Sequence, residues 1–288
     1  MIERLLKLAL IYIQHLNREK VLRRGEAIAS LLRSLKYRKD VVFKNLEIAF
    51  PDKDKKWKEK IYSETLLNMG RNLAEFFKIP QYYKTGEIKH IFSINEGKGI
   101  LDKYKGKGAI LVTAHLGNWE IAGSGLVSSG YKITALAYRQ KNKNVNSFIE
   151  EIRTNSGVDI IYHDQSLKKF LKVLNEGNFI AFLVDQNALR HRGVFVDFFG
   201  LKASTVSFPA KLAIKYKKPV IFTYCIFDEK TKKYSFFAKE ISYTGDNVEN
   251  LVQLYTKAVE NAVKQYPGQY LWTHKRWKTR PEGEKEFY

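Results

Sequence analysis

A histidine and a glutamate in one short segment carry the chemistry that the sequence suggests first. His115 and Glu120 begin and end the segment His-Leu-Gly-Asn-Trp-Glu, which follows the apolar run 109–114. A histidine can remove the proton of an attacking hydroxyl near neutral pH, and a carboxylate bonded to its other ring nitrogen fixes the tautomer. The pair therefore indicates general-base catalysis on an alcohol, with His115 as the base and Glu120 as its partner.

A strand and a helix must position this pair. The apolar run 109–114 predicts a strand that leads into His115, and open α/β sheets bind ligands at the carboxyl ends of their strands. Asn118 is suited to cap the next helix, which would place Glu120 in its first turn. Gly117 allows a tight backbone turn between them. We therefore expect the imidazole and the carboxylate to meet across this turn.

An ordinary structural explanation of the pair stays open at this point. A glutamate in the first turn of a helix is favoured by the helix dipole whatever the function, and a histidine at a strand end is often a satisfied polar group. The Gly-Ser-Gly at 123–125 does not have the spacing of a nucleophile elbow. It is better explained by close packing of this helix on the sheet.

Short apolar segments that alternate with helical ones predict an α/β fold. Strands are expected over residues 109–114, 132–138, 159–162, 179–184, 220–227 and 234–243. Helices are expected over residues 1–16, onward to about 35, 40–50, 54–77 (before Pro80 ends the pattern) and 248–265. The pattern predicts a mixed, largely parallel central sheet that is covered by helices, with an N-terminal helical extension.

The N-terminal segment has the pattern of an amphipathic helix. Residues 1–16 place apolar side chains on one side, and four basic residues follow between positions 18 and 24. Each basic group near an anionic surface adds about 1 kcal/mol to binding. We therefore expect residues 1–36 to be membrane-docking helices and residues 37–288 to form the α/β catalytic domain. A helix docked on its own domain is the alternative.

The charge balance calls for an anionic partner. The formal net charge is +20, from 50 Lys and Arg against 30 Asp and Glu, so nucleic acid, an anionic membrane or an acidic protein could bind. No spacing typical of a nucleic-acid-binding module occurs, so we expect no specific nucleic acid partner. The scattered histidines predict no metal site, and the single Cys225 cannot form a disulfide within the chain. No apolar stretch approaches the roughly 20 residues that span a bilayer.

Several blocks resemble one known family. The segment 114–120 resembles the His-x4-Asp/Glu motif of the lysophospholipid acyltransferase superfamily, in the form found in the lipid A biosynthesis (late) acyltransferases. Further blocks resemble the same family in the same order over about residues 38–281. These blocks are 39–51, 69–71 with Glu75, 185–186, 193–200, 209–213 and 270–278.

The resemblance implies an activity and a place in the cell. It implies transfer of a fatty acyl chain from an acyl carrier protein or coenzyme A thioester to a hydroxyl of a membrane glycolipid, above all a lipid A precursor. The thioester is the donor, and no cofactor is implied. The implied location is the cytoplasmic face of the inner (plasma) membrane. Because the N-terminal helix is shorter than is usual in the family and carries Lys7, we expect peripheral docking more than a stable anchor.

The resemblance also implies roles for particular residues. His115 would be the base and Glu120 the residue that orients it. Arg153 and Asp185 would belong to the site, where an arginine could bind a phosphate or the charge that develops on the carbonyl. We also place Asn118 at the substrate.

Arg139 is a weaker candidate for contact with the substrate. Two other interpretations of the function remain open. The acceptor could be another glycolipid or a lysophospholipid. The chain could also be a basic protein that binds membranes or nucleic acid without turnover. The presence of both His115 and Glu120 favours the enzyme, because a binding protein would not need the pair.

Overall fold

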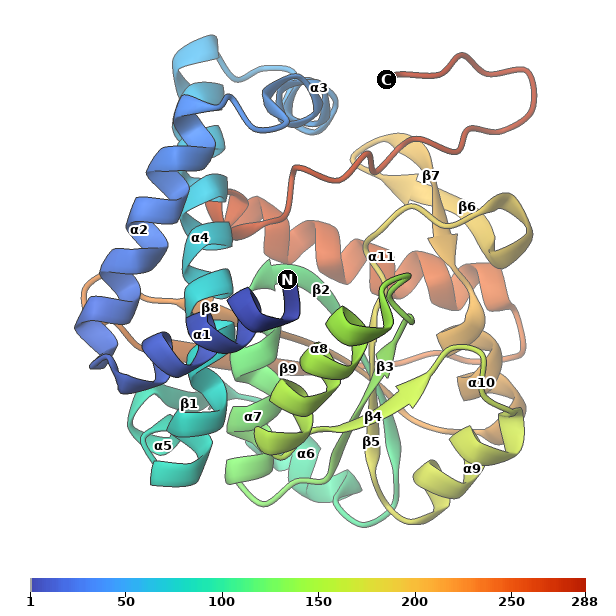
Figure 1. Cartoon of the computed structure of the whole chain (residues 1–288). Helices are drawn as coiled ribbons and strands as arrows, with labels where there is room; N and C mark the ends of the chain where they lie inside the picture. The colour runs from blue at the N-terminus through green and yellow to red at the C-terminus, as the bar shows by residue number, and fades with distance from the viewer. Residues whose placement is uncertain (1) are drawn as a thin grey trace.

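The structure of the chain is a computed structural model that describes residues 2–288, apart from the side chains of residues 2–5 and 7 (Figure 1). Met1, with which the expected amphipathic helix starts, lies outside the described residues. The described part of that helix is α1 (Ile2–His15), and α2 (Arg18–Ser34) follows it.

A seven-stranded sheet forms the centre of the molecule, in the order β1-β9-β8-β2-β5-β3-β4. The strands are β1 (Phe92–Glu96), β2 (Ala109–Gly117), β3 (Ile133–Ala137), β4 (Asp159–Tyr162), β5 (Phe179–Leu183), β8 (Val220–Phe227) and β9 (Tyr234–Ile241). β8, β2, β5, β3 and β4 are parallel. β9 runs antiparallel to β8, and β1 runs parallel to β9. The expected mixed, largely parallel sheet is therefore confirmed.

Helices cover both faces of this sheet (Figure 1). One layer packs α5 (Ile88–Ile91), α6 (Lys98–Tyr104) and α7 (Trp119–Ser128) on side chains such as Leu111. The other packs α9 (Leu167–Asn175), α10 (Phe208–Tyr216) and α11 (Val248–Gln265) on side chains such as Val112. Because neighbouring residues of a strand point to opposite faces, the continuous apolar run of β2 fills both layers.

The helix α4 (Lys55–Thr85) contributes to both layers. Its first half places Tyr62 and Leu66 in one core, and its last turns place Ile79 and Tyr82 in the other. Between them α4 passes the ends of β2 and β8, where Asn68 donates a hydrogen bond to the last residue of β2. α3 (Lys39–Ala49) packs beside the first half of α4, and α8 (Lys143–Asn155) also contacts it.

The expected stop at Pro80 is wrong, because α4 continues through this residue to Thr85. A proline inside a helix removes one backbone hydrogen bond. Here the flanking Ile79 and Tyr82 are buried, so tertiary packing offsets that loss. The helix ends at Thr85, and the next residue, Gly86, has a φ of 78° that suits a glycine cap.

The N-terminal helices pack on α4 and do not join the sheet. Figure 1 shows α2 alongside α4, and a Cβ added to Gly70 would lie 2.2 Å from the Gly25 carbonyl oxygen. Glycines at both positions therefore let the two helices approach closely. Within residues 2–288, no helix is both long and apolar enough to cross a membrane.

Three strands were not expected from the pattern. β1 is a short edge strand with mostly exposed side chains, so it lacks a clear apolar alternation. β6 (Gly193–Phe198) and β7 (Leu201–Val206) form a separate antiparallel hairpin that packs on α11. In addition, β2 extends past residue 114 to Gly117 and so includes His115 itself.

Candidate active site

The imidazole of His115 lies at the carboxyl end of the sheet and is held by an acid on the neighbouring strand. Thr113 pairs with Leu183 in the parallel β2–β5 ladder, and two residues further along each chain stand His115 and Asp185. His115 Nδ1 is 2.8 Å from Asp185 Oδ1. The strand register therefore brings the two side chains together.

The contact with Asp185 defines which ring nitrogen of His115 is free to act. Burial would raise the pKa of the Asp185 carboxyl, but the adjacent imidazole outweighs this effect and lowers the pKa. An ionised carboxylate can only accept a hydrogen bond, so Nδ1 of the neutral ring carries the proton. Nε2 then keeps a lone pair and can accept a proton from a substrate. The amide nitrogen of Gln186 lies 3.4 Å from Nε2.

The carboxylate of Glu120 makes a different set of contacts from the expected one. It forms an ion pair with Arg153, at 3.1 Å to Nε and 2.5 Å to Nη2, and both side chains are largely buried. Burial alone would lower the pKa of Arg153, but Glu120 reverses this and raises it. Trp119 Nε1 donates a further hydrogen bond to Glu120 over 3.1 Å. The ring of Trp119 also packs edge-on against His115, with ring centroids 4.7 Å apart.

Among the described residues, His115 and Glu120 do not form the expected direct bond. His115 pairs with Asp185 instead, and Glu120 pairs with Arg153. The physical reason is that Asp185 occupies the Nδ1 side of the ring, while the favourable partner for Glu120 is the cation of Arg153. Trp119 lies between His115 and Glu120, since it bonds to the carboxylate and packs on the imidazole. The catalytic role of Glu120 stays a prediction.

The turn between the two residues is formed as expected. Gly117 has a φ of 65°, and a Cβ there would lie 1.8 Å from the Cys225 carbonyl oxygen, so only glycine fits. Asn118 is the N-cap of α7, and its Oδ1 accepts hydrogen bonds from the backbone N–H groups of Glu120 and Ile121 at 3.1 and 3.0 Å. The buried Asn118 side chain thus holds the start of α7 and has no free face for substrate.

Arg139 lies away from the pair of strands that hold the histidine. It follows β3, forms an ion pair with Asp164 at 2.8 Å, and stacks over the ring of Tyr162 at 3.9 Å. Both charged side chains are about half exposed. The structure therefore does not bring Arg139 to His115.

A C-terminal segment ties the two strand ends together. The backbone N–H of Leu271 donates to the His115 carbonyl over 3.0 Å. The backbone N–H of Asn187 donates to His274 Nε2 over 3.0 Å, and Asn187 exchanges two more hydrogen bonds with Thr279. The block 270–278 was named above for its family resemblance, and its contact with the histidine was not predicted. The aromatic and basic composition of this segment is the feature of the sequence that could have indicated its role.

A mostly apolar cavity lies between α7 and the sheet, and one of its lining residues, Trp119, packs on His115. Trp119, Glu120 and Arg153 line it together with small or aliphatic side chains. The remaining lining residues are Leu111, Thr113, Ala122, Gly123, Leu126, Ile133, Ala135, Leu136, Val158, Ala181, Leu183, Thr223 and Phe236. Small residues on α7, β3 and β5 leave this space open. The arrangement offers a base next to a place for an apolar chain.

Comparisons with known proteins agree with such chemistry. The chain is an acyltransferase. It belongs to the bacterial lipid A biosynthesis acyltransferase family, whose model matches residues 3–279.

Named relatives cover most of the chain at low identity. A lipid A biosynthesis acyltransferase of Haemophilus influenzae is 26% identical over 83% of this chain and 76% of its own length. A lipid A biosynthesis palmitoleoyltransferase of Escherichia coli is 25% identical over 92% of this chain and 87% of its own. A phosphatidylinositol mannoside acyltransferase of Mycobacterium tuberculosis is 24% identical over 74% of this chain and 69% of its own.

The contact of His274 with Asn187 predicts a pH-dependent stability. Burial lowers the pKa of His274 to about 4, and Arg276 adds to this effect while Asp185 opposes it. Since an unfolded histidine titrates near pH ~6.5, the unfolded chain binds the proton more tightly between these values. The free energy of unfolding should therefore fall as the pH drops from about 6.5 to about 4, by up to ~3 kcal/mol from this group.

The variant His274→Gln isolates this contribution, because its amide oxygen can still accept from Asn187. Urea unfolding at about pH 7 and about pH 4.5 should show a smaller pH effect in the variant than in the parent protein. An equal pH effect in the two proteins would contradict the assignment.

Proposed function

We propose that the protein transfers a fatty acyl chain from an acyl thioester to a hydroxyl of a membrane glycolipid, with His115 as the general base. The observation that carries the proposal is the 2.8 Å bond between His115 Nδ1 and Asp185 Oδ1. With the ring proton on Nδ1, Nε2 can take a proton from a substrate. This nitrogen lies at the carboxyl end of the sheet, which is where open α/β sheets bind ligands.

The reaction needs one proton to move twice. The acceptor hydroxyl oxygen attacks the thioester carbonyl carbon while its proton passes to His115 Nε2. The tetrahedral intermediate then expels the thiolate, the C–S bond breaks, and the imidazolium returns the proton to sulfur. Asp185 stabilises the imidazolium between these steps, as the acid of a catalytic triad does. No covalent intermediate on the protein and no cofactor is required.

Three neighbouring residues support this reading. The Gln186 amide nitrogen lies 3.4 Å from Nε2, where the acceptor hydroxyl would arrive, so it is placed to contact the acceptor. Arg153 and Glu120 line the cavity as an ion pair. A paired arginine can still turn some of its N–H groups toward a phosphate or a developing oxyanion, because the guanidinium has five donors.

The apolar cavity is the proposed place for the acyl chain. Its lining is predominantly aliphatic, and Trp119 closes the side next to the histidine. An acyl chain in it would leave the thioester carbonyl near His115. Burying each methylene contributes about 0.8 kcal/mol, so each methylene that fits in the cavity would add to donor binding. Either acyl carrier protein or coenzyme A could present the thioester, and the net charge of +20 suits an acidic carrier.

A lipid A precursor is the acceptor that we propose first. The support is the family match together with relatives named as lipid A biosynthesis acyltransferases. A phosphatidylinositol mannoside is the alternative, because a relative of similar identity is named for it. Both are glycolipids, so either reading calls for an acceptor that is delivered from a membrane.

We also propose that α1 and the start of α2 dock on the anionic cytoplasmic face of the inner membrane. Leu8, Ile11 and Tyr12 are 63%, 54% and 48% exposed, and their spacing puts them on one side of α1. Arg24 of α2 donates hydrogen bonds to the Tyr12 hydroxyl, so basic charge borders this apolar stripe. Apolar side chains bordered by basic ones are typical of helices that lie in a membrane interface.

The base is tested by replacing His115 and Asp185 separately. His115→Ala should lower the turnover of acyl transfer by about 10²-fold to 10⁴-fold, because the hydroxyl loses its base. Asp185→Asn should lower it comparably, since an amide can donate to Nδ1 and invert the tautomer. Transfer from lauroyl, myristoyl and palmitoyl thioesters to a lipid A precursor without secondary acyl chains, followed by mass spectrometry, measures both. Full turnover in folded His115→Ala would exclude the mechanism.

The cavity is tested by filling it with Ala181→Leu. The larger side chain should reduce kcat/KM for long thioesters more than for short ones, by about fourfold for each methylene that no longer fits. The ratio of the two values within one variant corrects for any loss of folded protein. An unchanged ratio would mean that the acyl chain binds elsewhere.

The docking surface is tested with the double variant Leu8→Glu and Ile11→Glu. Two charges in the apolar stripe should weaken binding to phosphatidylglycerol vesicles by more than about tenfold in a sedimentation assay. Leu167→Glu on α9, where the side chain is 38% exposed, is the matched control and should bind normally. Equal binding by all three proteins would argue against docking through α1.

A further inference from the structure

Side chains of the α4 helix hold the catalytic turn, which is residues 115–120. Asn68 and Asn72 lie on one side of α4 and both donate their side-chain amides to the carbonyl oxygen of Gly117, at 3.1 and 2.7 Å. This carbonyl lies between the histidine and the N-cap of α7. Two donors on one acceptor restrict the position of this turn.

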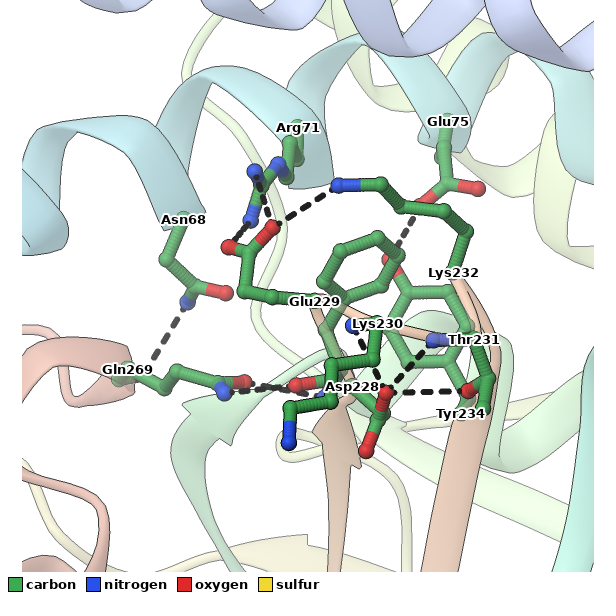
Figure 2. Close-up of polar contacts among 11 residues, drawn as sticks. Asn68, Arg71, Glu75, Asp228, Glu229, Lys230, Thr231, Lys232, Tyr234 and Gln269 are labelled. Atoms are coloured by element: carbon green, nitrogen blue, oxygen red, sulfur yellow. Dashed lines mark hydrogen bonds and ion pairs between the residues drawn. The ribbon is translucent and has the colours of Figure 1, made fainter.

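A buried carboxylate continues the same row of polar residues. Glu75 is fully buried, and Figure 2 shows it reaching from α4 toward the hydroxyl of Tyr234 on β9. Glu75 Oε2 accepts a hydrogen bond from that hydroxyl, and Oε1 accepts one from Arg18 Nε over 3.3 Å. Burial raises the pKa of Glu75, and Arg18 and Tyr234 oppose the rise. Because both oxygens already accept, the geometry favours an ionised carboxylate.

The hydroxyl of Tyr234 links this carboxylate to the N-cap of α7. Asn118 Nδ2 lies 3.4 Å from the Tyr234 oxygen, and both side chains are buried. The other end of the amide, Oδ1, accepts from the backbone N–H groups of Glu120 and Ile121. A chain of hydrogen bonds therefore runs from α2 and α4 through β9 to the first turn of α7.

Only one direction of donation satisfies every member of this chain. Asn118 Oδ1 must face the backbone N–H groups, so Nδ2 must donate to Tyr234. The Tyr234 hydroxyl then donates its hydrogen bond to Glu75. Burial and the Glu75 charge hold the pKa of Tyr234 well above its ordinary value, so the hydroxyl keeps its proton. A flipped Asn118 amide would turn Nδ2 toward the two backbone N–H groups. It would also turn Oδ1 toward the Tyr234 oxygen, whose hydrogen already points at Glu75, so the Glu75 contact favours the capping orientation.

We propose that Glu75 and Tyr234 are positioning residues for the catalytic turn, acting through Asn118. By orienting this cap they hold the first turn of α7, which places the Trp119 ring on the imidazole. The inference rests on the proposed function for its readout. It assigns no contact with substrate to either residue, so it predicts an effect on turnover and not on donor binding.

The ion pair nearby on α4 supplies a contrast. Arg71 pairs with Glu229 on the turn after β8, and Figure 2 shows this pair beside Glu75 but separate from Tyr234. Glu229 is 55% exposed. Breaking either the Arg71–Glu229 pair or the Glu75–Tyr234 bond would loosen α4 in general. Of these two contacts, only the Glu75–Tyr234 bond connects to Asn118 and would position the catalytic turn.

The test compares two buried tyrosines that each donate one hydrogen bond. Tyr234→Phe removes the link to Asn118, and Tyr255→Phe removes a bond to the Val206 carbonyl on the other side of the sheet. We expect kcat to fall about tenfold or more in Tyr234→Phe, which corresponds to ~1.4 kcal/mol, with KM for the lauroyl thioester within about twofold. Tyr255→Phe and Glu229→Gln should retain kcat within about twofold.

A double variant tests whether Tyr234 acts through the cap. If it does, adding Tyr234→Phe to Asn118→Ala should cause no further loss of kcat, whereas independent roles would give additive losses. Hydrogen exchange in the peptide 115–124 gives a readout without substrate and should rise in Tyr234→Phe but not in Tyr255→Phe. If Tyr234→Phe does not fold, Glu75→Gln, which keeps the side-chain shape, takes its place in each comparison.

The outcomes separate this inference from the proposed function. If His115→Ala is inactive while Tyr234→Phe turns over like the parent protein, the positioning role is wrong and the base assignment stands. If His115→Ala keeps its activity, the base assignment is wrong, and the exchange measurement alone then decides on the role of Tyr234. Additive losses in the double variant, or an equal loss in Tyr255→Phe, would also overturn the inference.

Discussion

The site depends on one hydrogen bond between neighbouring parallel strands, from His115 on β2 to Asp185 after β5. Its 2.8 Å length requires both strands to end at the same level, which the in-register pairing from Ala109 with Phe179 to Thr113 with Leu183 provides. A shift of one residue would turn one of the two side chains to the opposite face. The apolar layers on both faces of β2 therefore do more than stabilise the fold, because they fix the register that assembles the site.

Charged groups around this bond are buried in pairs. Glu120 lies against Arg153, and Glu75 lies against Arg18 and the Tyr234 hydroxyl. A buried carboxylate without a partner would cost several kcal/mol, so each pair restricts where its element can lie. These pairs anchor α7 and α4 around the histidine without using its ring nitrogens. The imidazole is left with one strong partner at Nδ1, while the amide nitrogen of Gln186 lies 3.4 Å from Nε2.

Local patterns were enough to predict the elements that carry the histidine. The apolar run before His115, the helix-capping Asn118 and the flexible Gly117 each act through neighbours in the chain, and the fold class follows from alternating segments. The partner of His115 was not predicted, because the order β8-β2-β5 brings together residues 70 positions apart. Asp185 was expected in the site, but nothing local distinguished it from Glu120 as the acid at Nδ1.

The remaining differences have the same cause. Pro80 lies inside α4 because tertiary burial outweighs a local rule. Glu75 and Tyr234 meet because α4 crosses the strand ends, which the local sequence does not reveal. A charged residue among the apolar residues of this helix was the feature that could have indicated a buried contact.

The tautomer of His115 tests the account most directly. In protein labelled with nitrogen-15 at histidine, with the His115 signal assigned by its loss in a His115→Gln variant, two-bond nitrogen–proton correlation spectra distinguish the two neutral forms of the ring. We predict that Nδ1 carries the proton and Nε2 does not, and that Asp185→Asn reverses this pattern while Glu120→Gln leaves it unchanged. A ring protonated at Nε2, or one whose tautomer responds to Glu120 and not to Asp185, would contradict the central claim.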